Sequence, residues 1–574
     1  MAMCIVGALS ADTPCHDKKL PPELCAPEAR SDYGMVATDS PEATRVAVEI
    51  LEKGGNAIDA AVAAALTLGV VNPESSGIGG VTNILIHLAN GNTIAVDGMS
   101  HSPMRIYLER FREFKKSGRT FGYETIAVPT TLATLEHART RYGSFDLATL
   151  LQPAIEIAEH GYPLSRVQII KTQKYYDDLM NSSAYMRSLV FEDGRTIGKP
   201  GDRRCQPDLA NTYRRIASEG VRSFFSGSIA REIEADMIRG GSFLRRSDLA
   251  KVSVRVVEPL HTTYRGYDVY TFPPPGGGAF VVSILNLLET FPSDFLATSS
   301  AERHQVFLDT FRIAAADSPK AVSRQKISGM DPLSKRHARR RAELIVPGQM
   351  VRKELYSTPP DPDCIRSGEN TTQVTVADSL GNVVSLTQTL SRSFGAKAAT
   401  PGLGFPYNGF LADFAAENPR CAGYLRPDMP IMTPMSPTIV FKDGKLFAAL
   451  GSPGSDKIPP LVTGVISNMV DRKMGVGDAV TAPRVLWGGD PPGAAYIEVF
   501  DPITKNDIRA LNRMGFSDIS DLRYPPRRKT KATTSDFGSV NAVAYDPETG
   551  IFTGVGDPRR YGSAMGPRVV VTRE

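Results

Sequence analysis

The feature that most constrains the fold is a series of strand pairs joined by tight turns in the C-terminal third of the chain. ENTTQVTVADSLGNVVSLTQTL, residues 369–390, has two strand-like runs separated by a short polar turn, which is the pattern of a β-hairpin. Two more pairs follow at residues 436–454, with a strong Asp443-Gly444 turn signal, and at residues 540–557. Strand pairs of this kind predict antiparallel sheets, which need other layers to cover their apolar faces.

Helical patterns fill most of the chain before residue 371. The run Ala57–Leu68 is rich in alanine nearly all round, which predicts a helix buried between layers. An earlier helix has Ser40 as its expected cap and Pro41 in its first turn, and it ends before Gly54. Further helices are predicted over residues 128–142, 146–160, 207–238, 300–317 and 458–472. The expected fold class is α+β, a four-layer sandwich with two central antiparallel sheets, preceded by an N-terminal arm over residues 1–34.

Charge and residue spacing exclude several function classes. The net charge of +4 is small for 574 residues, and the basic runs at 335–341 and 525–531 lack interleaved aromatic residues, so nucleic-acid binding is not expected. The cysteines form no CxxC pair and the histidines no HxxH or HxxxH pair, so no metal, cofactor or dithiol redox centre is expected.

The compartment is constrained only weakly by the sequence. No apolar run approaches the roughly 18 residues of a membrane helix, so no membrane span is expected. The start MAMCIVGALSA is apolar but lacks a basic segment, which favours a cytoplasmic protein slightly over a secreted one. Three of the six cysteines lie in the first 25 residues, where export would allow a disulfide.

The hairpin places two threonines at one end of a strand pair. If residues 378–382 form the loop, Thr371 lies opposite Thr389, and their hydroxyls share one face of the sheet. A register shifted by one residue would separate them. Cross-strand threonine pairs are also ordinary sheet stabilisers, so the pair alone is compatible with a purely structural role.

One chemistry needs this arrangement. Thr371 can attack the Asn370 carbonyl, break the chain and become a new N-terminus, whose α-amine has an unperturbed pKa of about 7.7 to 8.0 and can then act as the base. The turn LGSPGSDKI could supply an oxyanion hole through the backbone N–H groups of Gly454 and Ser455. The alternative for this turn is a simple connection from a strand to a helix.

These residues lie within a broader resemblance. GMVATDSPEATRVAVEILEKGGNAIDAAVAAALTLGVVNPESSGIGG, PPPGGGAFVVSILNLLE, TTQVTVADSLGNVVSLTQT, GSPGSDKI and GDPRRYGSA, in this order, make the chain similar to the γ-glutamyltranspeptidase (glutathione hydrolase) family from about Gly34 to Arg560. The resemblance implies an N-terminal nucleophile (Ntn) hydrolase αββα fold. It also implies cleavage between Asn370 and Thr371 into a large segment, 35–370, and a small segment, 371–574, which stay associated. The acyl group of a small-molecule donor would then pass from Thr371 to water or an amine.

The family's reaction residues carry over by motif. Thr371 matches the nucleophile, Thr389 the hydroxyl bonded to it, and Gly454 and Ser455 the paired oxyanion glycines, of which only the first is still glycine. Asp413, in NGFLADF, matches the aspartate that binds the glutamyl α-ammonium.

The substrate-binding positions depart from the family pattern. Met99 stands where the family has the arginine for the α-carboxylate. Loss of this guanidinium removes a strong partner of the carboxylate. Arg105 and Arg392 are the candidates to compensate. The other changed positions are Ser391 for asparagine, Phe410 for glutamine, Gln373 for histidine, and Thr433-Pro434 for a pair of serines.

Three functions follow from this pattern. The first is a γ-glutamyl hydrolase or transferase acting on glutathione-like amides, and the second is an acylase or amide-forming enzyme with the same threonine chemistry and a remodelled pocket. The third is a non-catalytic binding protein on this fold. Retention of Thr371, Thr389 and the glycine turn as a set speaks against the third.

Overall fold

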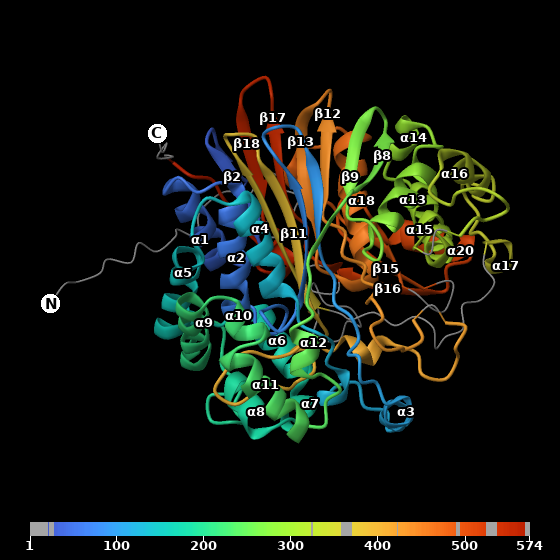
Figure 1. Cartoon of the computed structure of the whole chain (residues 1–574). Helices are drawn as coiled ribbons and strands as arrows, with labels where there is room; N and C mark the ends of the chain where they lie inside the picture. Colours follow the sequence, from blue (N-terminus) through green and yellow to red (C-terminus); the bar gives the residue numbers. More distant parts are fainter. Residues whose placement is uncertain are drawn as a thin grey trace.

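The computed structural model describes residues 21, 24, 28–322, 325–356, 370–421, 423–488, 494–523 and 537–568. Two seven-stranded antiparallel sheets lie face to face in the centre, and helices cover the outer face of each sheet (Figure 1). This is the predicted four-layer α+β sandwich. Within the described residues, no helix combines the length and apolar composition that crossing a bilayer requires.

The first sheet carries the hairpin that begins at Asn370. In spatial order its strands are β19 (Ser563–Met565), β2 (Gly34–Thr38), β10 (Asn370–Asp378), β11 (Val383–Ser391), β3 (Val81–His87), β4 (Thr93–Gly98) and β7 (Arg255–Val257). Every residue of β10 and β11 is buried, because this sheet has helices on one side and the second sheet on the other.

The second sheet contains the other two predicted strand pairs. In spatial order its strands are β1 (Ala29–Ser31), β18 (Ile551–Val555), β17 (Asn541–Asp546), β13 (Lys445–Gly451), β12 (Thr438–Lys442), β9 (Tyr267–Thr271) and β8 (Leu260–Tyr264). The predicted Asp443-Gly444 turn joins β12 to β13. Part of the expected N-terminal arm, residues 29–31, is therefore an edge strand, whereas residues 1–20 lie outside the described ranges.

Apolar side chains fill the space between the sheets, and a few hydrogen bonds cross it. Ala377 of β10, Ile439 of β12 and Val543 of β17 belong to one buried cluster in this layer. The Ser385 hydroxyl donates to the Leu450 carbonyl at 2.9 Å. Such bonds between buried partners fix the hairpin relative to the second sheet.

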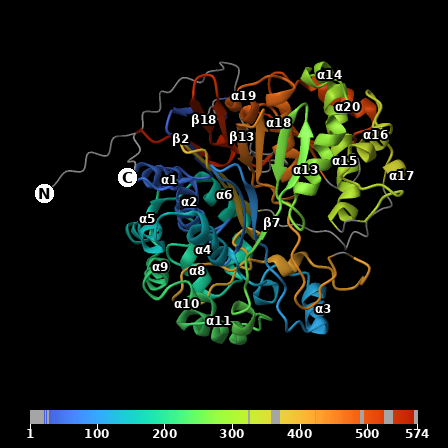
Figure 2. The same ribbon diagram turned by 45° about the horizontal axis from the view of Figure 1, so that its top comes forward.

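The helices outside the first sheet form the largest apolar cluster. They include α1 (Pro41–Glu52), α2 (Ala57–Val71), α4 (Thr131–Tyr142), α5 (Leu147–His160) and α9 (Pro207–Glu219) (Figures 1 and 2). All 15 residues of α2 are buried, as its alanine content predicts, and Asn56 caps its first turn. Ser40 occupies the N-cap position of α1, but its hydroxyl donates to Glu42 and accepts no backbone N–H.

A second group of helices covers the other sheet and forms its own apolar cluster. It consists of α13 (Gly278–Leu288), α15 (Ala301–Val322), α16 (Lys335–Ala342), α18 (Ile458–Val470), α19 (Val476–Thr481) and α20 (Lys505–Met514). Figure 2 shows these helices on the side of the molecule opposite α1 and α2.

The single helix predicted over residues 207–238 is wrong. The structure has three helices there: α9, α10 (Arg222–Phe225) and α11 (Ser228–Arg239). Gly220 ends α9 with a φ of 79°, which is outside the helical region. The apolar periodicity continues through both breaks, so the pattern does not reveal them.

Shorter elements complete the described chain. They are α3 (Leu108–Lys116), α6 (Arg166–Lys174), α7 (Tyr176–Met180), α8 (Ala184–Val190), α12 (Arg246–Leu249), α14 (Ser293–Ala297), α17 (Lys353–Tyr356), β5 (Tyr162–Pro163), β6 (Arg203–Arg204), β14 (Val485–Trp487), β15 (Ala494–Val499), β16 (Asp518–Arg523), and the 3-10 turns η2 (Tyr123–Thr125), η4 (Phe410–Asp413), η5 (Ser455–Lys457) and η7 (Pro558–Arg560).

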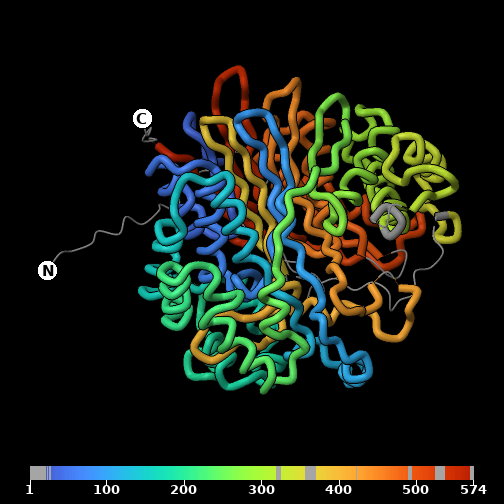
Figure 3. The backbone as a smooth tube through the Cα atoms, in the orientation of Figure 1, coloured from blue at the N-terminus to red at the C-terminus, as the bar shows by residue number. Residues whose placement is uncertain are grey.

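The hairpin lies between strands from the beginning of the chain. β10 pairs with β2 over residues 374–378, and β11 pairs with β3 over residues 383–389. In the tube of Figure 3 the yellow hairpin accordingly runs beside blue N-terminal segments. Strands on both sides of residue 370 are therefore interleaved in one sheet.

Candidate active site

Thr371 and Thr389 meet at the start of the hairpin. The register of β10 and β11 places them opposite each other, as the pattern predicts. The Thr371 hydroxyl donates to Thr389 Oγ1 at 3.4 Å, and the Thr389 hydroxyl donates to the Asn370 carbonyl. Thr389 thus polarises the Asn370 carbonyl and also contacts the Thr371 hydroxyl that would attack it. We call the four residues predicted to carry the reaction, Thr371, Thr389, Gly454 and Ser455, the reaction centre.

A β-bulge lies at the bond between Asn370 and Thr371. Asn370 pairs with Ser391 while Thr371 pairs with Thr389, which leaves Leu390 unmatched. The Asn370 side-chain amide donates to the Glu74 carbonyl at 3.3 Å and also to the Ser393 hydroxyl. Bulges bend a strand and redirect its side chains. The strand is therefore bent at the peptide bond between Asn370 and Thr371, and two hydrogen bonds hold the Asn370 side chain.

The Gly454-Ser455 turn follows β13 toward this end of the hairpin. Gly451, the last residue of β13, packs so closely that a Cβ there would collide with the Gln373 side chain, two residues after Thr371. Gly454 and Ser455 both have positive φ, 147° and 59°. Ser455 thus keeps a backbone conformation that favours glycine, and the change from the family's second glycine leaves its backbone N–H in place.

Asp413 is joined to the reaction centre by hydrogen bonds. The Ser391 backbone N–H donates to Thr389 Oγ1 at 2.8 Å, and the Ser391 hydroxyl donates to the Asp413 carboxylate at 2.8 Å. Arg392 forms an ion pair with the same carboxylate. Burial raises the pKa of Asp413, and the Arg392 guanidinium and the Ser391 hydroxyl partly offset that shift.

Phe410, in the same 3-10 turn as Asp413, packs in an apolar cluster. Met99 and Phe410 are 4% and 5% exposed and belong to one buried cluster with Val81, the β3 residue opposite Thr389. We call Met99, Ser391, Arg392, Phe410 and Asp413 the head-group site. It contains the ion pair of Asp413 with Arg392, the Ser391 hydroxyl and the apolar side chains of Met99 and Phe410.

Thr433 and Pro434 lie in a loop that packs on the chain before α13. Thr433 Oγ1 accepts from the Met435 backbone N–H at 3.0 Å, and the Thr433 N–H donates to the Pro275 carbonyl at 3.1 Å. The Pro434 carbonyl lies where a Cβ on Gly277 would be. The Thr433 hydroxyl therefore bonds within its own turn. Pro434 packs on Gly277 and has no side-chain hydrogen-bond donor.

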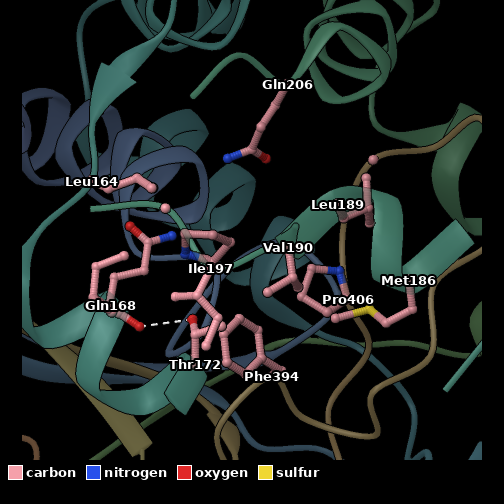
Figure 4. Close-up of a pocket in the computed structure, with 14 residues that line it drawn as sticks. Leu164, Gln168, Thr172, Met186, Leu189, Val190, Ile197, Gln206, Phe394 and Pro406 are labelled. Atoms are coloured by element: carbon pink, nitrogen blue, oxygen red, sulfur yellow. Dashed lines mark hydrogen bonds between the residues drawn. The ribbon is translucent and has the colours of Figure 1, made fainter. Parts of the chain in front are cut away.

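A pocket near the hairpin is separate from both sets of residues. Gln168, Met186, Ile197 and Phe394 are among the side chains that line it (Figure 4). None of the predicted site residues lines it. The backbone N–H of Phe394 donates at 2.9 Å to the Glu74 carbonyl that also holds Asn370. This pocket thus adjoins the anchor of Asn370 and does not include Asp413.

Comparison with known proteins identifies the family. The family model described as Gamma-glutamyltranspeptidase matches residues 43–567. A glutathione hydrolase proenzyme of Pseudomonas sp. (strain A14) is 33% identical over 497 residues, which cover 82% of this chain and 84% of the relative. The chain belongs to the gamma-glutamyltranspeptidase family.

Acylases are among the relatives of this gamma-glutamyltranspeptidase-family chain. Acylase ACY 1 proenzyme of Pseudomonas sp. (strain V22) is 30% identical, with 92% of each chain covered. The crystal structure of cephalosporin acylase from Bacillus halodurans matches with a TM-score of 0.82 and 26% identity, covering 96% of this chain and 97% of the other. The protein is therefore an enzyme of the Ntn-hydrolase type, and its relatives include both glutathione hydrolases and acylases.

The two arginines proposed to compensate for Met99 have different positions in this family member. Arg105 is exposed and lines a surface pocket with Glu234 and Arg246. Arg392 contacts Asp413. Only Arg392 is therefore placed to act in the head-group site.

Sequence reasoning missed a buried acid beside the hairpin. The Asp39 carboxylate accepts from the Gln373 backbone N–H at 2.6 Å and from the Ser539 hydroxyl at 2.8 Å. Burial raises the pKa of Asp39 to about 6, against the lowering effect of these bonds and of Arg560. The available signal was an aspartate between a strand and a helix in ATDSPEA, within a stretch that resembles the family.

A buried ion pair near Asn370 was also missed. Lys171 Nζ lies 3.7 Å from Glu74 and donates to the Ser75 hydroxyl at 2.8 Å. Burial lowers the pKa of Lys171 to about 8, with Glu74 acting in the opposite direction. Because Glu74 also holds Asn370 through its backbone carbonyl, this pair stabilises the anchor of the bulge. No local sequence pattern connects residues 74, 171 and 370.

Proposed function

We propose that this enzyme cuts its own chain between Asn370 and Thr371 and then transfers acyl groups through an ester on Thr371 to water or an amine. The observation that carries the proposal is the contact of Thr389 with both the Thr371 hydroxyl and the Asn370 carbonyl. An attacking group held next to its target replaces a bimolecular encounter by an intramolecular one, which can lower a barrier by roughly 7 to 11 kcal/mol.

The same residues support both stages of this mechanism. Before cleavage, the Thr371 hydroxyl attacks the Asn370 carbonyl, and Thr389 donates to the oxygen that becomes negative. The peptide C–N bond then breaks, the hydroxyl proton passes to the Thr371 nitrogen, and water hydrolyses the ester between Asn370 and the Thr371 oxygen, which separates the two fragments. After cleavage, the freed α-amine of Thr371 takes the hydroxyl proton, and the donor amide replaces the Asn370 carbonyl as the electrophile. The backbone N–H groups of Gly454 and Ser455 are the proposed oxyanion donors at this stage.

We further propose that the acyl pocket is remodelled away from a γ-glutamyl head. Met99 and Phe410 lie in one apolar cluster, and the Asp413 carboxylate is engaged by Ser391 and Arg392. The α-carboxylate of a glutamyl group would lose the family's arginine, and its ammonium would compete with Arg392. The relatives include glutathione hydrolases as well as acylases, so support for the remodelled pocket comes from Met99, Phe410 and the engaged Asp413.

Intact mass measurement of the purified protein tests the self-cleavage. Division of 62.1 kDa between 370 and 204 residues gives products of about 40 and about 22 kDa, and the smaller must begin TTQVTVAD. A different N-terminus, or an active uncut chain, would show that the nucleophile is misassigned. Glutathione turnover tests the pocket separately: a kcat/KM of about 10⁴ M⁻¹s⁻¹ or more would contradict the remodelling.

A further inference from the structure

The turn that follows α2 contacts both strands of the hairpin at its bulge. The Glu74 carbonyl accepts from the Asn370 side-chain amide at 3.3 Å, at the start of β10. The carbonyl of the next residue, Ser75, accepts from the Leu390 backbone N–H at 3.1 Å, in β11. Leu390 is the residue that the bulge leaves unmatched. Two consecutive carbonyls of one turn therefore hold the chain on both strands of the bulge.

The side chains of the same two turn residues bind a lysine of α6. Lys171 Nζ donates to the Ser75 hydroxyl at 2.8 Å and lies 3.7 Å from Glu74 Oε1, and the Ser75 hydroxyl donates to this oxygen at 3.2 Å. Burial lowers the pKa of Lys171 to about 8, so most of the ammonium is still protonated at pH 7. A charged side chain from another helix thus holds the turn from the side opposite its carbonyl contacts.

The Glu74 carboxylate depends on this ammonium. Glu74 is 0% exposed and Lys171 is 7% exposed. Within the described part of the chain, Glu74 forms no other ion pair, and its Oε2 is buried without a hydrogen-bond partner. Removal of one member of a buried pair leaves an uncompensated charge, which is strongly unfavourable. Without Lys171, the carboxylate would move toward water or another donor, and the turn backbone would move with it.

We propose that Lys171 is a positioning residue for self-cleavage, which acts through Glu74 and Ser75 on the two carbonyls that hold Asn370 and Leu390. This inference rests on the proposed function, because it concerns the geometry of the bond that the nucleophile cuts. The lysine does not contact the reacting atoms. Its role is to keep the turn, and with it the bulge, in the position that favours attack.

This role belongs to maturation and not to later turnover. Asn370 supplies the attacked carbonyl only before the cut. Afterwards the donor amide supplies that carbonyl, and the strand pairing of Thr371 with Thr389 positions the nucleophile. Loss of Lys171 should therefore slow self-cleavage much more than acyl transfer, which distinguishes positioning from a general effect on the fold.

The rate of self-cleavage tests the proposal first. Freshly translated, pulse-labelled chain is followed on a denaturing gel as it converts into two fragments. Lys171→Met should convert about 10- to 100-fold more slowly, because a misplacement of about 1 Å can reduce a rate by as much as 10²-fold. Lys171→Arg keeps the charge and should keep most of the rate. Arg166→Met removes an exposed cation from the same helix and should convert like the wild type.

Turnover by the processed variants is the second measurement. Once conversion is complete, hydrolysis of hexanoyl-p-nitroanilide and of γ-glutamyl-p-nitroanilide is compared with the wild type. We expect each kcat/KM of Lys171→Met to stay within about threefold of the wild-type value. A wild-type cleavage rate in Lys171→Met would overturn the proposal. An equal loss of cleavage and turnover would also overturn it, since that result indicates a general structural role.

A double-mutant cycle tests the route from Lys171 to the bulge. In an Asn370→Ala background, Lys171→Met should slow cleavage several-fold less than in the wild type, because one of the two contacts through which it acts is gone. An undiminished effect would mean that Lys171 does not act through Asn370. If Lys171→Met does not fold, Glu74→Gln replaces it, since this variant removes the other charge of the pair and keeps the size of the side chain.

These measurements separate the inference from the function on which it rests. A wild-type chain that stays uncut would contradict the proposed Thr371 chemistry itself. A wild-type chain that is cut at Thr371, together with variants that are cut equally fast, would contradict only the role of Lys171.

Discussion

The reaction centre and the head-group site differ in what defines them. The reaction centre consists of backbone register, a bulge and hydroxyl groups within one hairpin and one turn. The head-group site consists of side chains from three separate segments, around Met99, Ser391 and the turn Phe410–Asp413. A register cannot change without unfolding the sheet, whereas single side chains can be exchanged. Under the proposed function, this difference would allow the acyl-transfer geometry to be kept while the bound acyl group changes.

The largest effect is expected from removal of the nucleophile. Thr371→Ala should remain a full-length chain with no acyl-transfer activity, because no hydroxyl is left to attack Asn370 or a donor. Thr371→Ser keeps the hydroxyl and should still be processed. A denaturing gel and an anilide assay measure both outcomes. Cleavage of Thr371→Ala would show that the nucleophile is another residue. The contrast between the reaction centre and the head-group site would then have no basis.

Met99→Arg tests whether the head-group site can be reverted by one side chain. We expect no gain of γ-glutamyl turnover and a loss of stability of about 3 to 5 kcal/mol, because an arginine in the apolar cluster would be a buried charge without a ready partner. The change in the thermal unfolding midpoint reports the loss. Met104→Arg is the matched control, since Met104 is 43% exposed. Efficient γ-glutamyl hydrolysis by Met99→Arg would mean that the site is less remodelled than we propose.

Thr389→Ala should weaken the reaction centre without unfolding the protein. Loss of one donor to a developing oxyanion lowers rates by about 10²- to 10³-fold, whereas loss of one hydroxyl changes stability by about 1 kcal/mol. Self-cleavage and anilide turnover should therefore both slow down, and Thr389→Ser should recover much of each rate. Unchanged rates for both steps would remove Thr389 from the mechanism.

The pKa of Asp39, which follows β2 and accepts from the Gln373 backbone N–H of the hairpin, predicts a pH effect on stability. The folded-state pKa of about 6 exceeds the ordinary value of 3.8 for an aspartate, so the native state binds the proton more tightly. The free energy of unfolding should therefore fall as pH rises from about 4 to about 6, by roughly 3 kcal/mol at most, and level off above that range.

Asp39→Asn should abolish this dependence because it cannot titrate. The midpoint of thermal unfolding at pH 4.5 and pH 7 measures the effect in the Thr371→Ala background, which keeps one chain. Asp32→Asn, at an exposed aspartate, is the control and should retain the wild-type difference. An equal pH dependence in Asp39→Asn would assign the effect to another group.

The reaction centre was accessible from the sequence because its determinants are local. The two-residue period of strands and a short polar turn predict the pairing of Thr371 with Thr389, and the structure has that pairing. The large layers were also predictable, because α2 and the three strand pairs have strong patterns. Helix breaks at residues 220 and 227 were missed, since apolar periodicity continues across them.

The head-group site could be predicted only in part. The resemblance marked Met99 and Phe410 as departures, but their packing in one cluster depends on segments that are far apart in the chain. The sequence offered Arg105 and Arg392 as equal candidates. Only Arg392 reaches Asp413. Its position depends on the positive φ of Ser391 and on a turn distant in the chain that carries Asp413, and no local pattern encodes either.

The interleaving of β10 and β11 with β2 and β3 has a consequence for the order of events in the life of the enzyme. Thr389 reaches the Asn370 carbonyl only in the paired hairpin, so under the proposed mechanism the cut comes after the sheet has assembled. A misfolded molecule would not acquire the free amine that serves as its base. Maturation would thus act as a checkpoint, in which correct folding is the condition for gaining activity.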